Sequence, residues 1–206
     1  MDKKERTKHW ENIFQEKNEN EVSWYQEKPT ESIELIENLH LNKKANIIDV
    51  GAGSSYLPDF LLKLGYENIY ALDISSSALA KSKKRLGNDA DKIHWIVEDI
   101  TTFNPPTLFD CWHDRAVFHF LTDDNDILKY VTLTHQSITK NGYLIIGTFS
   151  DKGPTKCSGI PIKQYTETDL EKLFSPYFDV ILSKRIDHQT PFNTIQNFVF
   201  VVFKKR

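Results

Sequence analysis

Apolar and polar positions alternate along the chain in blocks that predict strands followed by helices. Short apolar runs are typical of buried strands, and the stretches between them carry apolar residues at helical spacing. The predicted strands are residues 45–50, 68–73, 93–99, 109–117, 143–149, 178–186 and 197–205. The predicted helices are residues 30–41, 56–65, 75–87, 123–142 and 166–174. Apolar strands that alternate with helices indicate an α/β fold with a parallel sheet covered on both faces.

The last two strands depart from this alternation, since only a loop separates them. We therefore expect them to pair as a hairpin, which makes the seventh strand antiparallel to the others. The strongly apolar run 197–205 is typical of an interior strand. We predict a single domain over residues 1–206, in which residues 1–29 form an N-terminal lid segment, residues 30–206 form the core, and residues 149–165 form a substrate-side loop.

A glycine-containing loop follows the first predicted strand, in the sequence IIDVGAGSSYL (47–57). In open α/β sheets, ligands bind at the carboxyl ends of the strands, and glycine allows close approach to the backbone. A tight turn without a ligand is the alternative interpretation. A dinucleotide site requires a third glycine at position 56, where this chain has Tyr56.

Acidic residues close the next two predicted strands. Asp73 lies about 20 residues after Gly51, at the position of a carboxylate that binds ribose in nicotinamide or adenosine sites. Asp73 could instead cap the following helix beside Ser75. The pair Asp99–Ile100 follows the third predicted strand.

The segments DVGAGSS, LDIS, VEDI and NGYLIIGTF occur in this order and spacing. Together they resemble the class I S-adenosylmethionine-dependent methyltransferases, over roughly residues 30–206. The resemblance implies a Rossmann-like, doubly wound, seven-stranded sheet that is mostly parallel, with the last strand antiparallel in a C-terminal hairpin. One difference from the family is Ser55, at a position where the loop often has a third glycine.

The resemblance also implies which residues hold S-adenosylmethionine. Asp73 would accept hydrogen bonds from both ribose hydroxyls, because an ionised carboxylate offers two acceptor oxygens to a diol. Asp99 would accept from the adenine amine, and the Ile100 amide would donate to a ring nitrogen. The other residues implied are those of the methionine end and the adenine face: Asp49, Gly51, Ala52, Gly53, Ile74 and, from the N-terminal segment, Trp24, Tyr25 and Gln26.

The fourth strand ends in CWHDRAVFHFL (111–121), and in the family this end faces the reaction centre. His113 or Asp114 could act as a base, although proton loss to solvent before binding is equally compatible with the sequence. A structural ion pair is the alternative for Asp114 and Arg115, and core packing is the alternative for His119.

Further residues are expected on the substrate side. Aromatic faces stabilise a sulfonium or methylated ammonium, which points to Trp112 and to Trp10 in the N-terminal segment. The tryptophans of that segment could instead dock it onto the core. Cys157 and Ser158 are the expected specificity residues of the 149–165 loop.

The composition and charge of the chain disfavour several classes of binding partner. The 206 residues carry a net charge of −3 without a basic patch, which disfavours nucleic acid. No apolar run approaches the ~20 residues that span a bilayer, so we expect no membrane partner. Cys111 and Cys157 fit a reducing cytoplasm, and no histidine lies at a recognised metal spacing, so we expect no metal. The chain is expected to be a monomer or homodimer.

The methyl acceptor is less well defined. The Asn-Pro-Pro-Tyr type of motif used on flipped bases or glutamine amides is absent after strand four. We expect a small-molecule acceptor. The alternative is a protein lysine, because the segments around Trp10, Trp24 and His113 also resemble lysine methyltransferases. The alternatives of another class are a nicotinamide-dependent oxidoreductase and a noncatalytic cofactor-binding module.

Overall fold

The computed structural model describes residues 2–206. The chain divides into two compact units, and the boundary along the sequence lies between Asn104 and Pro105. The first unit contains α1 (Lys3–Glu16), the 3₁₀ helix η1 (Glu19–Glu21), α2 (Thr30–Glu37), β1 (Asn46–Val50), α3 (Leu57–Lys63), β2 (Asn68–Asp73), α4 (Ser76–Leu86), η2 (Gly87–Lys92) and β3 (Ile93–Val97). The second contains β4 (Phe109–Arg115), η3 (Phe118–Phe120), α5 (Asp124–Ser137), β5 (Ile138–Phe149), β6 (Lys156–Cys157), β7 (Ile160–Pro161), α6 (Glu167–Phe174), β8 (Phe178–Gln189) and β9 (Ile195–Lys205).

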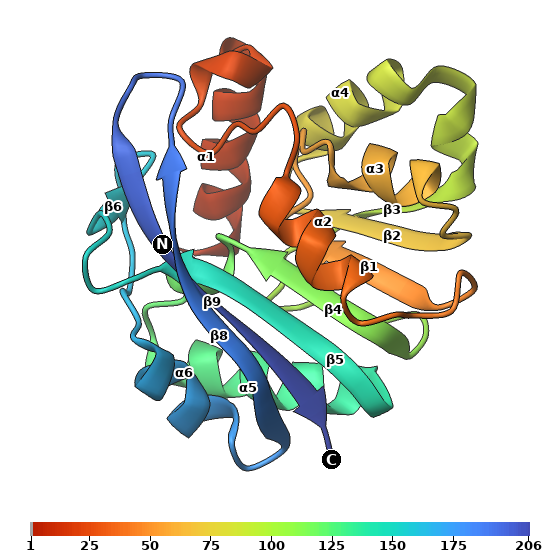
Figure 1. Ribbon diagram of the computed structural model, residues 1–206. Helices are drawn as coiled ribbons and strands as arrows, with labels where there is room; N and C mark the ends of the chain where they lie inside the picture. Colours follow the sequence, from red (N-terminus) through yellow and green to blue (C-terminus); the bar gives the residue numbers. More distant parts are fainter. Residues whose placement is uncertain (1) are drawn as a thin grey trace. The chain divides into compact units, whose positions relative to one another are not determined.

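In the first unit, parallel strands lie in the order β3–β2–β1. Ile47, Ile48 and Ile69 are fully buried, as expected for strands covered on both faces. Figure 1 shows α3 and α4 on one face of these strands, and both helices contact β2. This arrangement brings the ends of β1 and β2, where the glycine loop and Asp73 lie, to the same edge.

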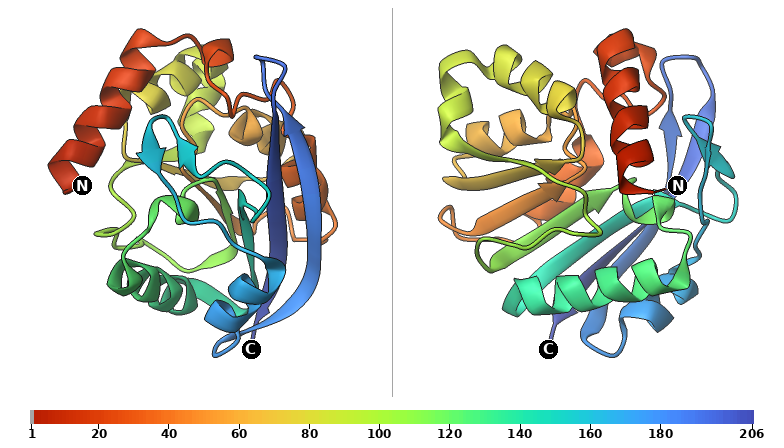
Figure 2. Two further views of the ribbon diagram at one scale, coloured as in Figure 1. Left: turned by 90° about the vertical axis from the view of Figure 1, so that its left-hand side faces the viewer. Right: turned by 180° about the vertical axis from the view of Figure 1, so that it is seen from behind.

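In the second unit, β4 pairs with β5 in parallel, and β9 lies antiparallel between β5 and β8. The interior position of β9 is the one that its apolar sequence predicts. Helices α5 and α6 lie on one face of these strands (Figure 2), where α5 contacts β5 and α6 contacts β8 and β9. Phe118 of η3 packs against Tyr130 of α5 and Phe174 of α6. The two units contribute seven strands to a mostly parallel sheet, which confirms the predicted fold class in the described residues.

Several element bounds differ from the sequence prediction: helix α2 ends at Glu37 instead of residue 41, and β8 continues to Gln189 instead of residue 186. The difference is largest at α5. Helix α5 ends at Ser137, and β5 begins at Ile138, although the sequence predicted a helix up to residue 142. Lys205 donates to the backbone oxygens of His135 and Ile138, which satisfies carbonyls at the helix end. The β-branched pair Ile138–Thr139 then favours an extended backbone.

The N-terminal lid segment (1–29) and the substrate-side loop (149–165) both contain regular structure that the sequence analysis did not predict. Helix α1 begins with a capping box in which Asp2 and Glu5 exchange hydrogen bonds. Strands β6 and β7 form a small hairpin within the 149–165 loop. Within residues 2–206, no helix combines the length and the apolar character that a membrane span requires.

Candidate active site

The glycine loop, residues 51–55, folds back against the end of β2. Gly51 and Gly53 have φ angles of 72° and 51°, a region that glycine enters at little cost. The amides of Gly51 and Ala52 both donate to the Leu72 carbonyl, at 2.8 and 3.0 Å. A Cβ added at Gly53 would lie 3.2 Å from Phe14 and 3.6 Å from Asp73, so a larger residue has little room here.

Asp73 is buried where β2 ends, and its two oxygens hold two backbone segments. Oδ2 accepts from the Gly53 amide and Oδ1 from the Ser75 amide, both at 2.8 Å. Burial raises the pKa of Asp73 to about 7, although these two backbone donors lower it. Nearby negative charges on Asp49 and Glu11 add to the increase. The alternative role for Asp73 is to cap the following helix, but the N-cap is Ser75, whose side chain accepts from the Ala78 amide.

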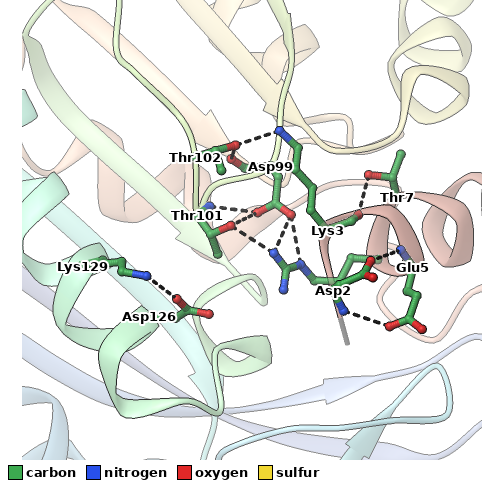
Figure 3. Close-up of polar contacts among 10 residues, drawn as sticks. Asp2, Lys3, Glu5, Thr7, Asp99, Thr101, Thr102, Asp126 and Lys129 are labelled. Carbon is green, nitrogen blue, oxygen red and sulfur yellow. Dashed lines mark hydrogen bonds and ion pairs between the residues drawn. The ribbon is translucent and has the colours of Figure 1, made fainter.

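Asp99 is engaged by the N-terminal helix (Figure 3). Arg6 donates to Asp99 Oδ2 from Nε and Nη2, at 3.0 and 2.8 Å, while Thr101 donates to Oδ1 from its amide and hydroxyl, at 2.9 and 2.8 Å. Burial acts to raise the pKa of Asp99, but these hydrogen bonds and the Arg6 charge keep it below the usual value. Beside this pair, Lys3 donates to Thr102.

Helix α1 also contacts the loop and α4. Glu11 accepts from the Ser76 amide and hydroxyl, at 2.5 and 2.8 Å, and from the Ser77 amide, at the N-terminus of α4. A carboxylate is favourable there because the first amides of a helix carry partial positive charge. Phe14 packs against Gly53 and is itself buried.

Aromatic residues of the N-terminal segment form a cluster with Phe14. Trp24 lies edge-on to Trp10 and to Phe14, with ring centroids 5.8 and 6.1 Å apart. Tyr25 contacts the ring of Tyr56. Trp10 was predicted on the substrate side, whereas these ring contacts place it with the residues around the glycine loop.

The remaining predicted cofactor residues lie on strand ends of the first unit or on the segment after η1. Asp49 is buried in β1, and Ile74 and Ile100 are half-buried directly after Asp73 and Asp99. Gln26 is half-buried after Tyr25. The first unit therefore contains every residue predicted to hold the cofactor.

In the second unit, Asp114 caps the turn after β4. Its Oδ1 accepts from the amides of Val117 and Phe118, at 2.9 and 3.2 Å, and its Oδ2 accepts from the Tyr130 hydroxyl at 2.6 Å. The side chain is fully buried, and burial raises its pKa to about 6. We therefore correct the expectation that Asp114 is a base, because the carboxylate is fully buried and three hydrogen bonds hold it in the fold.

Trp112 is also part of the core. Its indole is fully buried, contacts the rings of Phe109 and Tyr130, and donates to the Tyr130 hydroxyl at 3.1 Å. This corrects the expectation that Trp112 supplies an aromatic face to the substrate. His113, between these two residues, is buried as well.

Three of the predicted substrate-side residues are electrostatically coupled. Burial lowers the pKa of His119 to about 3 and raises that of Cys157 to about 11, and the Arg115 charge acts on both groups. His119 Nδ1 accepts from the Phe149 amide at 3.4 Å, whereas Nε2 has no hydrogen-bond partner among residues 2–206. At neutral pH, His119 is neutral and Cys157 is a thiol.

The substrate-side loop is tied to His119 through its backbone. Lys163 donates its amide to the His119 carbonyl at 2.8 Å. Ser158 and Gly159 form the turn between β6 and β7, with φ angles of 51° and 78°. This turn is of the kind that two-residue hairpins favour, and it supports the buried Cys157.

A cavity of about 820 Å³ in the first unit is lined by Asp59 and Arg85, among other residues. Glu67 and His94 line it near the amino ends of β2 and β3. Ligands bind at the opposite, carboxyl edge of such sheets. Among residues 2–206, no three His, Cys, Asp or Glu side chains are grouped to hold a metal ion.

Sequence reasoning missed four side chains around the candidate cofactor residues. Arg6 and Phe14 contact Asp99 and Gly53, and Glu11 and Arg85 contact the neighbouring start of α4 and the carbonyls of Ser54 and Ser55. For the first three, the signal was the capping box at Asp2 and Glu5, followed by aromatic residues Trp10 and Phe14 at helical spacing. Arg85 gave no such signal.

These features agree with known protein families. Residues 48–146 match a family model described as a methyltransferase domain. This match and the seven-stranded sheet described above both agree with the resemblance to class I S-adenosylmethionine-dependent methyltransferases.

Particular relatives and structures are similar to this chain. One is malonyl-[acyl-carrier protein] O-methyltransferase 1 of Ilyobacter polytropus, 28% identical over 111 residues, or 53% of this chain and 40% of the relative. Another is the eEF1A lysine and N-terminal methyltransferase of Mus musculus, 28% identical over 58% of this chain and 17% of the relative. The chain spans less than half the length of these two relatives. The N-methyltransferase NodS from Bradyrhizobium japonicum, solved with S-adenosyl-L-homocysteine, has a similar fold, with a TM-score of 0.69, 15% identity, and 96% and 98% coverage of the two chains.

The capping role of Asp114 predicts the effect of Asp114→Asn. We expect this change to reduce the free energy of unfolding by about 1–3 kcal/mol, because a charged acceptor of three hydrogen bonds is lost. Turnover of the folded variant should stay within about threefold of wild type. Urea unfolding and a methyl-transfer assay measure the two effects. A large loss of turnover at unchanged stability would instead support Asp114 as the base.

Proposed function

We propose that this chain transfers a methyl group from S-adenosylmethionine to a small-molecule nucleophile by in-line displacement. The observation that carries the proposal is the geometry of Gly53 and Asp73, in which a buried carboxylate holds a glycine loop at the ends of β1 and β2. Ligands of open α/β sheets bind at this edge.

The adenosine part of the cofactor fits these residues. Each Asp73 oxygen accepts one backbone hydrogen bond, and each has capacity for a second, which suits the two hydroxyls of a ribose. Asp73 makes no ion pair within residues 2–206, so its charge is available to a ligand. Ile74 would contact the adenine face. Asp99 would accept from the adenine amine, and the Ile100 amide would donate to the ring.

We assign the methionine part to the glycine loop and the N-terminal segment. Asp49, Gly51, Ala52 and Gly53 would contact it from the loop. Trp24, Tyr25 and Gln26 would cover it, and the aromatic cluster with Trp10 and Phe14 supports a lid role for this segment. Aromatic rings favour a positively charged sulfonium and exclude water.

The cofactor supplies an electrophilic methyl group, so the chain has mainly to orient the acceptor and exclude water. On the acceptor side we place Arg115, His119, Cys157 and Ser158. His119 Nε2 is a buried donor without a partner in residues 2–206, and the acceptor could use it. His113 is the remaining candidate base for an acceptor that arrives protonated.

Two acceptor classes have support from the relatives. The Ilyobacter relative is named as an O-methyltransferase of a carrier-bound acid, and the mouse relative as a lysine and N-terminal methyltransferase. We favour a small acceptor group, because His119 and Cys157 are buried and the overall charge is nearly balanced. Protein lysine is the second candidate.

A turnover assay tests this proposal and separates the two classes. S-adenosylhomocysteine release is measured with acids, thiols and amines in one series, and with protein extracts in another. We expect release with a small-molecule class, at a rate well above the blank without acceptor. Release with protein extracts alone would support lysine methylation. Calorimetry that shows NAD(H) binding and no S-adenosylhomocysteine binding would contradict the proposal.

Asp73→Ala should weaken S-adenosylhomocysteine binding by roughly 100-fold or more, because two charge-assisted hydrogen bonds to ribose are lost. Asp179→Ala, which removes an exposed carboxylate in the second unit, is the control and should bind as wild type. Calorimetry measures both.

The raised pKa of Asp73 also predicts a pH dependence. Ribose binding requires the ionised form, so wild-type affinity should increase as the pH rises from 6 to 8 through about 7. The sign for stability is opposite: Asp73 stabilises the unliganded fold at low pH, and this contribution is lost as the pH rises through about 7. An affinity for S-adenosylhomocysteine that falls over this range would contradict the ribose assignment.

Arg6 and the adenine amine would compete for Asp99, because the four hydrogen bonds from Arg6 and Thr101 use both carboxylate oxygens. Arg6→Met should therefore tighten S-adenosylhomocysteine binding severalfold and speed its association. Lys3→Met removes a neighbouring contact, to Thr102, without freeing a carboxylate, and should leave binding unchanged. Weaker binding by Arg6→Met in stopped-flow and calorimetric measurements would show that Arg6 supports the bound state.

A further inference from the structure

Arg85, in the last turn of α4, contacts backbone carbonyls of the glycine loop, whereas Asp73 accepts from a backbone amide of the loop. Its Nη1 donates to the Ser54 carbonyl at 3.0 Å, and its Nη2 donates to the Ser55 carbonyl at 2.7 Å. One turn earlier, the Ser82 hydroxyl donates to the Gly53 carbonyl at 3.2 Å. Three successive carbonyls of the loop are therefore held by one helix.

The same guanidinium holds two carboxylates from other elements. Nε and Nη2 donate to the two oxygens of Asp59 in α3, at 3.0 and 2.8 Å, and Nη1 donates to Glu19 of η1 at 2.9 Å. The guanidinium also lies 3.9 Å from the ring centre of Tyr56, whose hydroxyl donates to Glu19. Arg85 thus connects the loop to α3 and to the N-terminal segment.

This set of contacts requires the shape of arginine. A guanidinium offers five N–H donors in a plane and can stack on an aromatic ring, whereas a lysine ammonium has three donors and no plane. The Arg85 side chain is 17% exposed and lies beside two carboxylates. Loss of its charge would leave those carboxylates to repel each other.

The contacts of Arg85 also bear on Ser55, the position where the glycine loop differs from the family pattern. Ser55 carries a side chain in place of the third glycine, and its hydroxyl accepts from the Leu57 amide at the start of α3. The backbone at Ser54 and Ser55 is fixed by Arg85. Tyr56, which excludes a dinucleotide fingerprint, forms the surface on which the guanidinium stacks.

We infer that Arg85 is a positioning residue for the methyl donor: it fixes the glycine loop from behind and links that loop to the N-terminal segment that covers it. Arg85 acts through the loop and does not contact the cofactor in this role. This inference rests on the proposed assignment of the loop to the methionine end of the cofactor.

The test compares Arg85→Lys with Arg206→Lys. Arg206 is a matched control, because it also holds a carboxylate, Asp179, and a backbone carbonyl, that of Ser175, but in the second unit. We expect Arg85→Lys to weaken S-adenosylhomocysteine binding about 10- to 100-fold, since a displaced binding loop loses its alignment with the ligand. Arg206→Lys should bind within about twofold of wild type.

Two further readouts separate positioning from general stability. Hydrogen exchange at the amides of Gly53 and Ser55 should become faster in Arg85→Lys, while that of β5 amides stays unchanged. In turnover, the KM for S-adenosylmethionine should rise, while the KM for the acceptor stays constant. Should Arg85→Lys fail to fold, Asp59→Asn loosens the same clamp while keeping the side-chain shape, and a severalfold weaker affinity is then expected.

Unchanged S-adenosylhomocysteine affinity in a folded Arg85→Lys variant, with only a lower melting temperature, would overturn the inference. The Asp73→Ala variant distinguishes this result from failure of the proposed site. If Asp73→Ala loses binding and Arg85→Lys retains it, only the role of Arg85 is refuted. If both variants bind as wild type, the cofactor assignment itself is refuted.

Discussion

The buried carboxylate of Asp73 is the interaction on which the candidate site depends. It joins the Gly53 amide of the loop after β1 to the Ser75 amide at the start of α4. Burial without a cationic partner is unfavourable for a carboxylate, and the raised pKa of Asp73 reflects that cost. A ligand that donates two further hydrogen bonds would offset this cost. The unfavourable burial of the Asp73 charge in the free protein therefore favours ligand binding.

Three other acidic residues of the first unit form ion pairs with arginines. Asp99 is paired with Arg6, and Asp59 and Glu19 share Arg85. Each of these pairs fixes one part of the first unit, whereas Asp73 is stabilised by backbone amides alone. The distribution of cations therefore separates Asp99, Asp59 and Glu19, which form ion pairs, from Asp73, which we propose binds a diol. It also gives the N-terminal segment two electrostatic attachments, at Arg6 and at Glu19.

Local sequence signals predicted most of the architecture, because strand ends, helix caps and the interior β9 depend on nearby residues. The cap at Ser75 and the helix end at Gly87 are examples. The end of α5 was missed because it depends on Lys205, which is distant in sequence. The same limit applied to the site: Asp73 and the loop glycines were identified from spacing, but the clamp at Arg85 and the cap at Asp114 form only through tertiary contacts.

We propose that the methyl acceptor binds to residues of the second unit. Their protonation states at neutral pH limit which of them can remove a proton from the acceptor. His119 is neutral, with its Nδ1 used by a backbone amide, and its pKa near 3 makes it a poor base. Cys157 remains a thiol because burial raises its pKa. With Asp114 also held in the fold, the function we propose leaves proton removal to His113 or to solvent. An acceptor that is already unprotonated when it binds is therefore the one that these surroundings suit best, since its reaction needs only alignment and exclusion of water.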